Sequence, residues 1–455
     1  MLKLSTSVCA AILLTGIFVI GIAGASYYYY GRPHPTYLRI LHTHSDEMVD
    51  QVVSDFEKWY QQEYGQPIQM TAIHTDPRAA FENATTIFRK AEAEIWWGGP
   101  LSLFQKAYER LLPYNSTRKS DINLTHPYTL MDLSGNTPRW YAASLYGLGV
   151  MCNEHRLGEL NLSVPQAWTD LTFYKYHGNI AMVDPAESEV TSSLIMLMLQ
   201  SKNWTSGWEY LVTFSTQIEE YDIDERDSAL KASSDYLPFA VVPDFYAYER
   251  VAMNISQIGF TYLDGTILEP DPIAILSRGT YIDEAKAFID YILTAQAQEI
   301  IGRFLLPVDP DVTPPSELSP FDPDFPPVYR YNETLKEIIR DYHRAWITRR
   351  HNEIGLAYSE IREANKTKDA NPNATHYFDL AWSNFTYVGH YLNHTQIQNL
   401  FNATKGWTEN VASYAGRWVA SKWVEGEWGI LSREAYTNAL TNAQESKQAT
   451  KNKKP

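Results

Sequence analysis

Two histidines stand one residue apart at the end of a predicted strand. The apolar residues 38–41 are typical of a buried strand, and the stretch HTHSD, residues 42–46, follows them directly. Imidazole nitrogens are common ligands of catalytic metal ions, so a pair at this spacing suits a metal-dependent active site. The same stretch, here called the HTHSD loop, equally suits a loop that receives a ligand at the mouth of a cleft.

A metal-dependent enzyme needs more ligands than the HTHSD loop provides. One H-x-H pair cannot fill a coordination sphere, so further His, Asp or Glu ligands must come from later strand ends. His74 ends a predicted strand, but the later histidines fall in loop-like contexts or in the helical C-terminal region. No G-x-S-x-G, H-E-x-x-H, Walker or G-x-G-x-x-G pattern occurs. We therefore expect no enzyme activity, and an exported metal-dependent hydrolase that uses His42 and His44 is the alternative.

The composition is that of a folded chain with more than one packed unit. The 455 residues include 44 % hydrophobic and 20 % charged residues, which suits two or three globular units. The formal net charge of −16 argues against a nucleic-acid partner, which requires a basic face. Only Cys9 and Cys152 occur, and their positions predict neither a disulfide nor a metal site.

The N-terminal residues 1–31 predict export. No charged residue lies between Lys3 and Arg32, and residues 8–25 are almost wholly apolar. About 20 apolar residues span a bilayer, so the segment suits a transmembrane anchor with the body outside. A signal peptide cut after the small residues 23–25 is the other interpretation. In both cases the body lies on the outer side of the cell, and the anchor would attach it to the cell surface.

Asn-x-Ser/Thr sequons agree with an extracellular body. Their number exceeds what an unselected sequence would contain and predicts a glycosylated surface. The candidate acceptors are Asn83, Asn115, Asn123, Asn161, Asn203, Asn254, Asn332, Asn365, Asn373, Asn384, Asn393 and Asn402.

Strand and helix patterns alternate after the N-terminal segment. The expected order is a strand at 38–41, a helix at 46–62, a strand at 68–73, a helix at 77–92 and a strand at 94–99. Such alternation predicts a mainly parallel, doubly wound α/β sheet, in which ligands collect at the carboxyl ends of the strands. The HTHSD loop and the Trp-Gly-Gly stretch at 97–99 are two such ends. A second α/β stretch begins near residue 146, and a long helix is expected at 283–304.

Several stretches, taken in order, resemble the extracellular solute-binding proteins of ABC importers, nearest the group of ferric-ion-binding proteins. Each stretch is unspecific alone, but their order and spacing form a pattern that covers roughly residues 38–365. The stretches are LRILHTHSDEMVDQVVSDFEKWYQQEYGQPI (38–68), AEIWWGGPLSLFQKAYERLLPY (93–114), VPQAWTDLTFYKYHGNIAMVDPAES (164–188), FAVVPDFYAYE (239–249), the region 269–312 and WITRRHNEIGLAYSEIREAN (346–365).

This resemblance implies a two-lobed, type II periplasmic-binding-protein-like clamshell with a ligand cleft between the lobes. The first lobe would comprise residues 37–140 and 265–327, and the second residues 141–264. A helical C-terminal extension at 328–440 and a disordered basic tail at 441–455 would follow. The implied partners are a small-molecule or ion ligand and an ABC permease with its ATPase, and no cofactor is required.

The resemblance also implies a ligand set, with the HTHSD loop as the receiving loop of the first lobe. The expected ligand-binding residues are His42, Thr43, His44, Trp97, Gly98, Gly99, Trp140, Asp184, Ser188, Asp244 and Tyr246.

Two ligand classes remain open at this stage. Ferric-ion-binding members use two adjacent tyrosines, often with a histidine and a glutamate, so Fe³⁺ as the transported ligand would involve His44 and Tyr246. Here Phe245 replaces one tyrosine, and Gly98-Gly99-Pro100 stands where a carboxylate is expected. An organic solute that is cationic or carries a ring would suit an aromatic box with Asp244. The walls of this box would be Trp96, Trp97, Trp140, Tyr141 and Tyr246.

Overall fold

The computed structural model describes most of the chain after residue 35. The described residues are 36–86, 92–119, 131–202, 204–252, 257–263, 265–266, 268–312, 333–391 and 427–451. The predicted membrane segment at 1–31 therefore lies outside the described residues, as do six of the sequons. Within the described ranges, no helix is both long and apolar enough to cross a bilayer.

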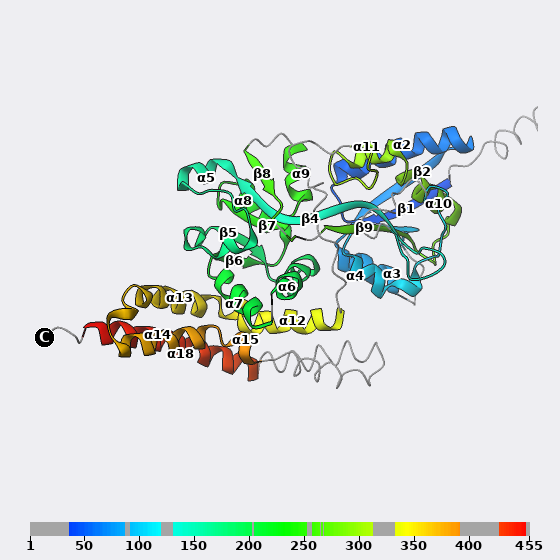
Figure 1. The fold of residues 1–455 in the computed structure, drawn as a ribbon. Coiled ribbons are helices and arrows are strands. Elements are labelled where there is room, and N and C mark those ends of the chain that lie inside the picture. The colour runs from blue at the N-terminus through cyan, green and yellow to red at the C-terminus, as the bar shows by residue number, and fades with distance from the viewer. Residues whose placement is uncertain are drawn as a thin grey trace, which may run out of the picture.

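The first lobe begins with a β–α–β unit. Strand β1 (Thr36–His42) pairs in parallel with β2 (Ile68–His74), and helix α2 (Asp46–Tyr64) connects them. Met48, Val52 and Phe56 recur at helical spacing, so α2 buries one face against the sheet. The lobe also contains α3 (Pro77–Thr85), β3 (Ile95–Trp97), α4 (Leu101–Lys106), β9 (Leu268–Ile275), α10 (Ile282–Ile292) and α11 (Ala295–Ile301). Helices α2, α10 and α11 cover one face of its sheet, and α3 and α4 cover the other (Figure 1).

The second lobe is a further α/β layer structure entered through one long strand, β4 (Tyr141–Asn153). Its strands are β5 (Ile180–Val183), β6 (Ile218–Asp222), β7 (Phe239–Pro243) and β8 (Ile258–Thr261). Its helices are α5 (Glu154–Leu160), α6 (Glu189–Ser201), α7 (Trp204–Ser215), α8 (Glu225–Ser233) and α9 (Phe245–Ala252).

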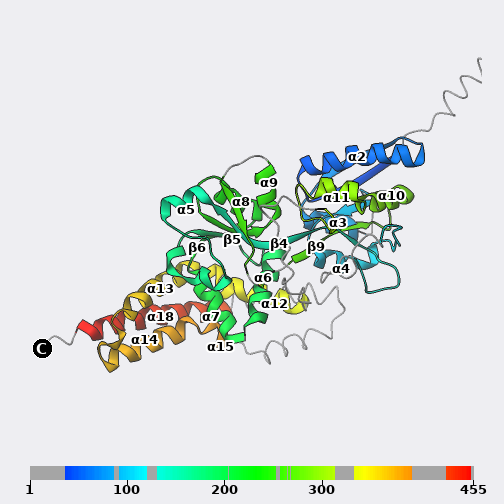
Figure 2. The same cartoon turned by 45° about the horizontal axis from the view of Figure 1, so that its top comes forward.

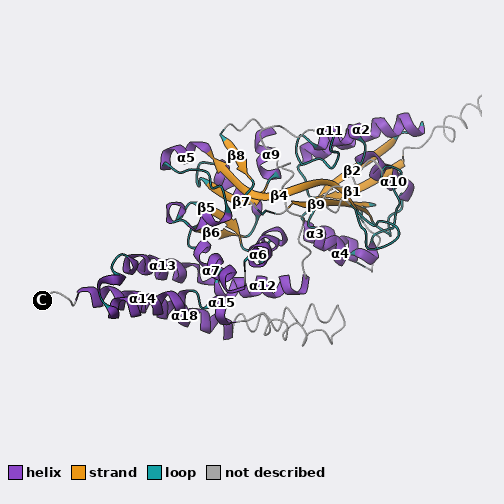
Figure 3. Cartoon of the chain, viewed as in Figure 1, coloured by secondary structure: helices purple, strands orange, loops and turns teal. Residues whose placement is uncertain are grey.

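One mixed sheet passes through both lobes (Figure 3). The strand order is β2-β1-β3-β9-β4-β7-β5-β6, and β8 pairs with β4 beside this path. The outer pairs β1–β2, β1–β3, β5–β6 and β5–β7 are parallel, whereas β9 and β4 run antiparallel to each of their neighbours. The prediction of a mainly parallel sheet is therefore wrong at its centre. The chain must run out of the first lobe and back into it, so the strands that connect the lobes pair antiparallel.

The C-terminal extension is helical and packs beside the second lobe (Figure 2). The Tyr342 ring meets Trp208 of α7 in the lobe and Trp428 of α18 within the extension, each at a centroid distance of 5.0 Å. The helices are α12 (Glu333–Trp346), α13 (His351–Asn365), α14 (Pro372–Phe385), α15 (Val388–Tyr391) and α18 (Glu427–Lys451).

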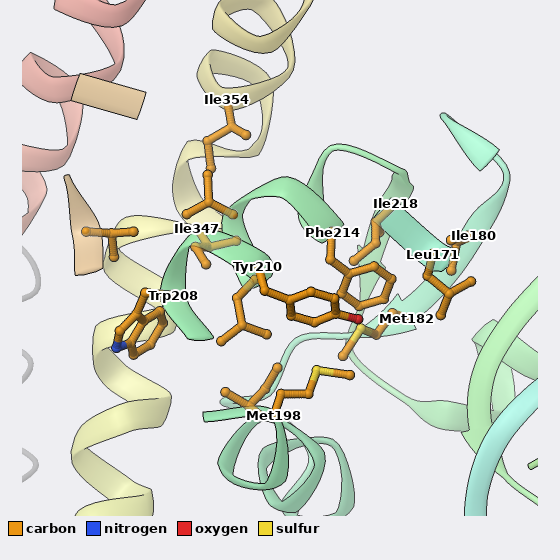
Figure 4. Packing of buried hydrophobic residues seen from close by; sticks show 14 of the residues in the cluster. Leu171, Ile180, Met182, Met198, Trp208, Tyr210, Phe214, Ile218, Ile347 and Ile354 are labelled. Atoms are coloured by element: carbon orange, nitrogen blue, oxygen red, sulfur yellow. The ribbon is translucent and has the colours of Figure 1, made fainter. Parts of the chain in front are cut away.

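The extension and the second lobe share one hydrophobic core. Figure 4 shows Met182, Met198 and Phe214 of the lobe near Ile347 and Ile354 of the extension. All five side chains belong to one continuous buried cluster. The apolar face of the extension is therefore covered by the lobe, which explains why this region is rich in aromatic residues.

Two predicted features of the C-terminal half differ in the structure. The tail expected to be disordered from residue 441 is the last part of α18, which continues to Lys451 and buries Ala443 and Ser446 against its neighbours. The single helix expected at 283–304 is two helices, because Thr294 stops α10 and caps α11 by accepting a hydrogen bond from the Ala297 amide at 3.3 Å.

Buried ion pairs fix α12 to the start of α6. The ammonium group of Lys336 lies 3.3 Å from the Glu189 carboxylate, and Arg340 binds the other carboxylate oxygen at 2.5 Å. Burial alone would raise the pKa of Glu189, but Lys336 and Arg340 lower it to about 2. The Glu189 carboxylate is thus ionised and neutralised by two cations of the extension.

We predict that Glu189→Gln destabilises the protein, because it removes the buried carboxylate that Lys336 and Arg340 bind. Breaking a buried pair on one side costs about 3–5 kcal/mol, and the free energy of unfolding in urea should fall accordingly. The double variant Glu189→Gln/Lys336→Met also removes the buried ammonium group and puts an apolar chain in its place, so part of the loss should return. A double variant as unstable as the single one would contradict this role of the pair.

Candidate functional site

A cleft of about 600 Å³ lies between the two lobes. The first lobe contributes side chains from the carboxyl ends of β1 and β2, from the loop after β3 and from β9. The second lobe contributes the loops after β5, β6 and β7 together with Tyr146 of β4. This volume falls within the range of small-molecule sites, and its place at strand ends agrees with the rule for open α/β sheets.

Helix starts surround this cleft. Helices α2, α3, α4, α6, α8 and α9 all begin at or beside residues that line it. Several of these helices carry their own caps: Asp76 accepts from the Arg78 and Ala79 amides, and Asp224 accepts from the Arg226 amide at 2.6 Å. These carboxylates serve the local backbone, and the arginines that follow them point their charge toward the cleft region.

The first-lobe wall is built around His44 of the HTHSD loop. His44 Nε2 lies 3.1 Å from Asp271 Oδ2, and the imidazole ring meets Trp97 edge-on at 4.9 Å. Asp271 also accepts hydrogen bonds from the Gly99 amide at 3.3 Å and the Ser144 hydroxyl at 2.9 Å. The carboxylate of β9 therefore positions the histidine and the glycine loop together.

Gly98 allows this close approach. Its φ is +94°, and a Cβ atom there would lie 2.4 Å from Thr43 Oγ1 and 2.6 Å from His44 Nε2. Only glycine fits such a place without strain, which explains the glycines where a carboxylate is expected from the resemblance. Gly98 itself stands behind the loop, while its neighbour Gly99 lines the cleft.

The second-lobe wall is acidic but largely neutralised. Glu187 binds Arg344 of α12, and Arg78 of the first lobe lies 3.6 Å from its carboxylate. Arg78 also donates to the Glu187 carbonyl oxygen at 3.2 Å, so this contact crosses from one lobe to the other. Glu189 is neutralised by α12 as described above. Because both carboxylates are paired with cations, they repel an anionic ligand less strongly than two unpaired acidic side chains would.

Glu225 and Tyr246 lie in a part of the cleft where burial disfavours the charged form of both side chains. The Ser188 hydroxyl donates a hydrogen bond to the Glu225 carboxylate, and burial raises the pKa of Glu225. Burial also raises the pKa of Tyr246, and the nearby Glu225 and Asp224 carboxylates raise it further. A protonated phenol can donate or accept a hydrogen bond, but it is a poor ligand for a metal ion.

Five of the predicted ligand residues line the cleft, namely Thr43, His44, Gly99, Ser188 and Tyr246. The structure places the others away from it. Trp97 and Trp140 are buried in two cores of the first lobe, as are Trp96 and Tyr141, so the predicted aromatic box is not assembled. Asp184 accepts from Arg344 Nε at 2.9 Å and holds α12 to the lobe. The cleft's aromatic side chains are instead Tyr146, Phe245, Tyr246 and Phe304.

His42 and His44 have different partners and do not form a pair. His42 is buried at the end of β1 beside His74, and burial together with His44 and His74 lowers its pKa to about 4. The strand ends at His42, so the alternation that would place residues 42 and 44 on one face does not continue. The geometry of the metallohydrolase motif is therefore not present.

Arg78 and Arg226 are cleft residues that the sequence did not single out. Arg78 lies in the first turn of α3, and Arg226 in the first turn of α8, on opposite lobes. Both follow an Asp that caps its helix, so the pattern Asp-x-Arg after a strand is the signal that would have indicated them.

One predicted glycosylation acceptor, Asn83, is buried in the structure. Asn83 is only 7 % exposed in α3, and its side-chain oxygen accepts a hydrogen bond from the Glu92 amide at 3.2 Å. A glycan cannot be attached there in the folded chain. Asn115, Asn161, Asn365 and Asn373 are exposed, and Asn384 is half-buried.

A family profile decides what kind of protein this is. The profile of the bacterial extracellular solute-binding proteins matches residues 108–326, which include the whole second lobe and the return to the first. The chain is therefore similar to the bacterial extracellular solute-binding proteins over nearly half of its length. It is 29 % identical over 161 residues to the phosphoglycerate transport regulatory protein PgtC of Salmonella typhimurium. That alignment covers 35 % of this chain and 40 % of PgtC, so the match spans less than half the length of this relative.

Solved structures of periplasmic binding proteins share the fold of this chain. The periplasmic binding protein AfuA of Actinobacillus pleuropneumoniae, described with bound fructose-6-phosphate, has a TM-score of 0.54 at 20 % identity. This likeness covers 74 % of the present chain and 98 % of AfuA. The ferric binding protein of Campylobacter jejuni has a TM-score of 0.51 at 16 % identity, over 63 % of this chain and 90 % of that one. The two-lobed periplasmic-binding-protein fold is thus common to neighbours described with different ligands.

We predict that Gly98→Ala displaces His44 and weakens the binding of any ligand in the cleft. The added methyl group would meet Thr43 and His44, and a positive φ costs a non-glycine residue about 1–2 kcal/mol. Gly65→Ala is the matched control, because its φ is +69° but nothing lies within 4 Å of the added Cβ. Thermal melts should show both variants destabilised, and only Gly98→Ala should alter the His44 signal in NMR spectra. Equal effects on His44 would disprove the steric argument.

The buried environment of Asp244 predicts that the stability of the protein falls as the pH rises toward 7. Its carboxylate is fully buried away from the cleft, where it accepts from the Gly147 amide and the Tyr262 hydroxyl, each at 2.7 Å. Burial raises the pKa of Asp244 to about 7, against the opposing effect of these hydrogen bonds. Between about pH 4 and 7 the folded chain holds a proton that the unfolded chain lacks, so this contribution stabilises at low pH and is lost as the pH rises to 7.

Asp244→Asn should remove that pH dependence. In urea unfolding at pH 5 and pH 8, the wild-type protein should lose more stability at pH 8 than the variant does, by at most about 2.7 kcal/mol, because the effect accrues at about 1.36 kcal/mol per pH unit between pH 5 and the pKa of about 7. Measuring the difference between the two proteins cancels the titration of all other groups. An identical pH dependence in both would mean that Asp244 titrates normally.

Proposed function

We propose that this chain is the extracellular substrate-binding component of an ABC importer, which captures a small organic solute between its lobes and delivers it to a permease driven by an ATPase. The observation that carries this proposal is the cleft of about 600 Å³, lined by both lobes and spanned by one continuous strand. Lobes joined in this way can close over a ligand by a hinge motion. The family match supports transport rather than catalysis.

The division into lobes belongs to the same proposal. We assign residues 37–140 and 265–327 to the first lobe and 141–264 to the second. The pairing of β4 supports a passage between the lobes within this strand, a few residues after the proposed boundary, because Tyr141–Gly147 pairs with β9 and Leu148–Asn153 pairs with β7 and β8. Export and attachment to the membrane through residues 1–31 are also part of the proposal, and the family description supports an extracellular position.

An organic solute fits the cleft better than a bare ferric ion does. A single ion would leave most of the volume unused, and the cleft has the size of typical small-molecule sites. The raised pKa of Tyr246 disfavours the phenolate that binds Fe³⁺, and Phe245 provides no second one. Iron, which the fold of the Campylobacter neighbour suggests, is the second candidate because the cleft also contains His44 and several carboxylates.

An anionic group on the solute is supported by Arg78 and Arg226. These arginines come from opposite lobes, and Arg226 is exposed with no carboxylate within ion-pair distance in the described part of the chain. Arginine binds carboxylate and phosphate through several donors at once. The names of PgtC and of the AfuA complex, which mention phosphoglycerate and fructose-6-phosphate, support a phosphorylated organic solute.

The first test is native mass spectrometry of the purified full chain in a non-ionic detergent, followed by thermal melts with a ligand panel. The panel contains phosphorylated three- to six-carbon compounds, cationic ring compounds and Fe³⁺. A phosphorylated compound at 100 times its Kd should stabilise the protein by about 2.7 kcal/mol. A coloured tyrosinate–iron complex would instead favour iron, and no shift with any member would contradict the proposed capture of these solutes.

Arg226→Gln tests the role of the cleft arginine. We expect at least a tenfold weaker Kd for the anionic compound, because a charge-assisted hydrogen bond contributes about 1.5–3 kcal/mol. Arg433→Gln is the matched control, since Arg433 is equally exposed but lies on α18, outside the cleft lining. Equal affinities in both variants would exclude Arg226 from the site.

A further inference from the structure

Three side chains with metal-binding groups converge at one corner of the first lobe. His42, Asp46 and His74 each place one ligand atom within 4.8 Å of the other two. His74 Nδ1 lies 3.2 Å from Asp46 Oδ1, and His42 Nε2 lies 4.0 Å from the same oxygen. The cluster therefore has two imidazoles and one carboxylate around a common point.

The β1–α2–β2 unit brings these residues together. His42 and His74 end two parallel strands and are direct partners in the register, so their side chains lie on the same face of the sheet. Their rings meet edge-on at a centroid distance of 5.2 Å. Asp46 is the first residue of α2, which starts just beyond the end of β1. The convergence is thus a property of the most regular part of the lobe.

The distances agree with metal coordination after a small adjustment. Two atoms that are each about 2.0–2.1 Å from a zinc ion can be at most about 4.2 Å apart. The two measured separations satisfy this limit. Asp46 and His74 have side chains that are 76 % and 42 % exposed, so both can turn toward an ion without disturbing the core.

The hydrogen bonding of His42 is an independent observation. The residue is 1 % exposed, its Nδ1 atom is buried without a hydrogen-bond partner, and its Nε2 atom is beyond hydrogen-bond distance from Asp46. A buried imidazole nitrogen without a hydrogen-bond partner is uncommon. A bound cation would use the other ring nitrogen, Nε2, which faces Asp46.

We propose that His42, Asp46 and His74 bind a divalent metal ion of the borderline class, such as Zn²⁺, at the rim of the cleft. Two imidazoles and one carboxylate are a ligand set that zinc accepts while keeping a fourth position open. His74, the next residue Thr75 and Ser45, which precedes Asp46, all line the cleft. The open position therefore faces the cleft side, where water can occupy it. His44 is not a ligand, because its Nε2 faces Asp271.

The test is a titration of the full-length protein with Zn²⁺ in isothermal calorimetry, and with Co²⁺ in visible absorption. We expect one ion per chain and a ligand-field spectrum typical of mixed nitrogen and oxygen ligands. Asp46→Asn and His74→Gln should each weaken Zn²⁺ binding at least about tenfold, a loss that even outer-sphere substitutions produce. Both changed side chains are exposed, so the fold should persist, and thermal melts will verify it.

His155→Gln is the matched control. His155 is an exposed histidine with two acidic neighbours, Glu159 at 3.8 Å and Asp235 at 3.6 Å, but they face different ring nitrogens and cannot share one ion with the imidazole. Unchanged Zn²⁺ affinity in this variant, with loss in the other two, supports the site. Absent stoichiometric binding, or affinities unaffected by Asp46→Asn and His74→Gln, would overturn it. The solute panel is independent of this result, since it measures capture in the cleft without added metal.

Discussion

The pairing of strand β4 is the constraint on which the rest of the structure depends. All thirteen of its residues are buried, so each backbone donor and acceptor must find a partner inside the protein. The first part of the strand obtains these partners from β9 and the second part from β7 and β8. One continuous strand, whose pairing with β9 shifts register once between Ala142 and Ser144, thus joins both lobes, and the cleft lies where this strand passes from one to the other. Asp244 strengthens the crossing by accepting a hydrogen bond from the Gly147 amide.

Cationic side chains of the C-terminal extension neutralise carboxylates beside the cleft. Without α12, the loop after β5 would present Asp184, Glu187 and Glu189 together at the start of α6. Lys336, Arg340 and Arg344 approach from one side of α12 and neutralise these three carboxylates. The extension is therefore part of the second lobe in an energetic sense, since its hydrophobic core and its buried charges both continue into that lobe. Lys106 of α4 also lies 3.3 Å from Glu337, so α12 contacts the first lobe as well.

The two histidines of the HTHSD loop lie in different environments of the first lobe. His42 belongs to the end of the sheet and faces His74, whereas His44 belongs to the loop and faces Asp271 across the start of the cleft. The end of β1 between them changes the direction of the side chains. A spacing that resembles a chelating pair is thereby divided between two neighbouring environments, one at the rim and one inside the cleft.

Much of the fold was determined by the sequence alone, because it depends on local patterns. The apolar runs and the helical spacing of Met48, Val52 and Phe56 indicated the β1–α2–β2 unit, and the order of the motifs indicated two lobes with a cleft. Local pattern also placed Thr43, His44 and Gly99 directly after strands, and these residues line the cleft.

Tertiary structure alone decided which of the neighbouring side chains reach the cleft and how they are charged. Trp97 and Trp140 lie in hydrophobic cores because the sheet of the first lobe is covered on both faces. The sequence of a single strand does not show this covering. The pKa of Glu189 is lowered by Lys336, a group 147 residues away in the chain, and the Glu225 carboxylate accepts a hydrogen bond from Ser188, 37 residues away. Burial and charge are set by contacts between distant segments, and these contacts exist only after the sheet has brought the segments together.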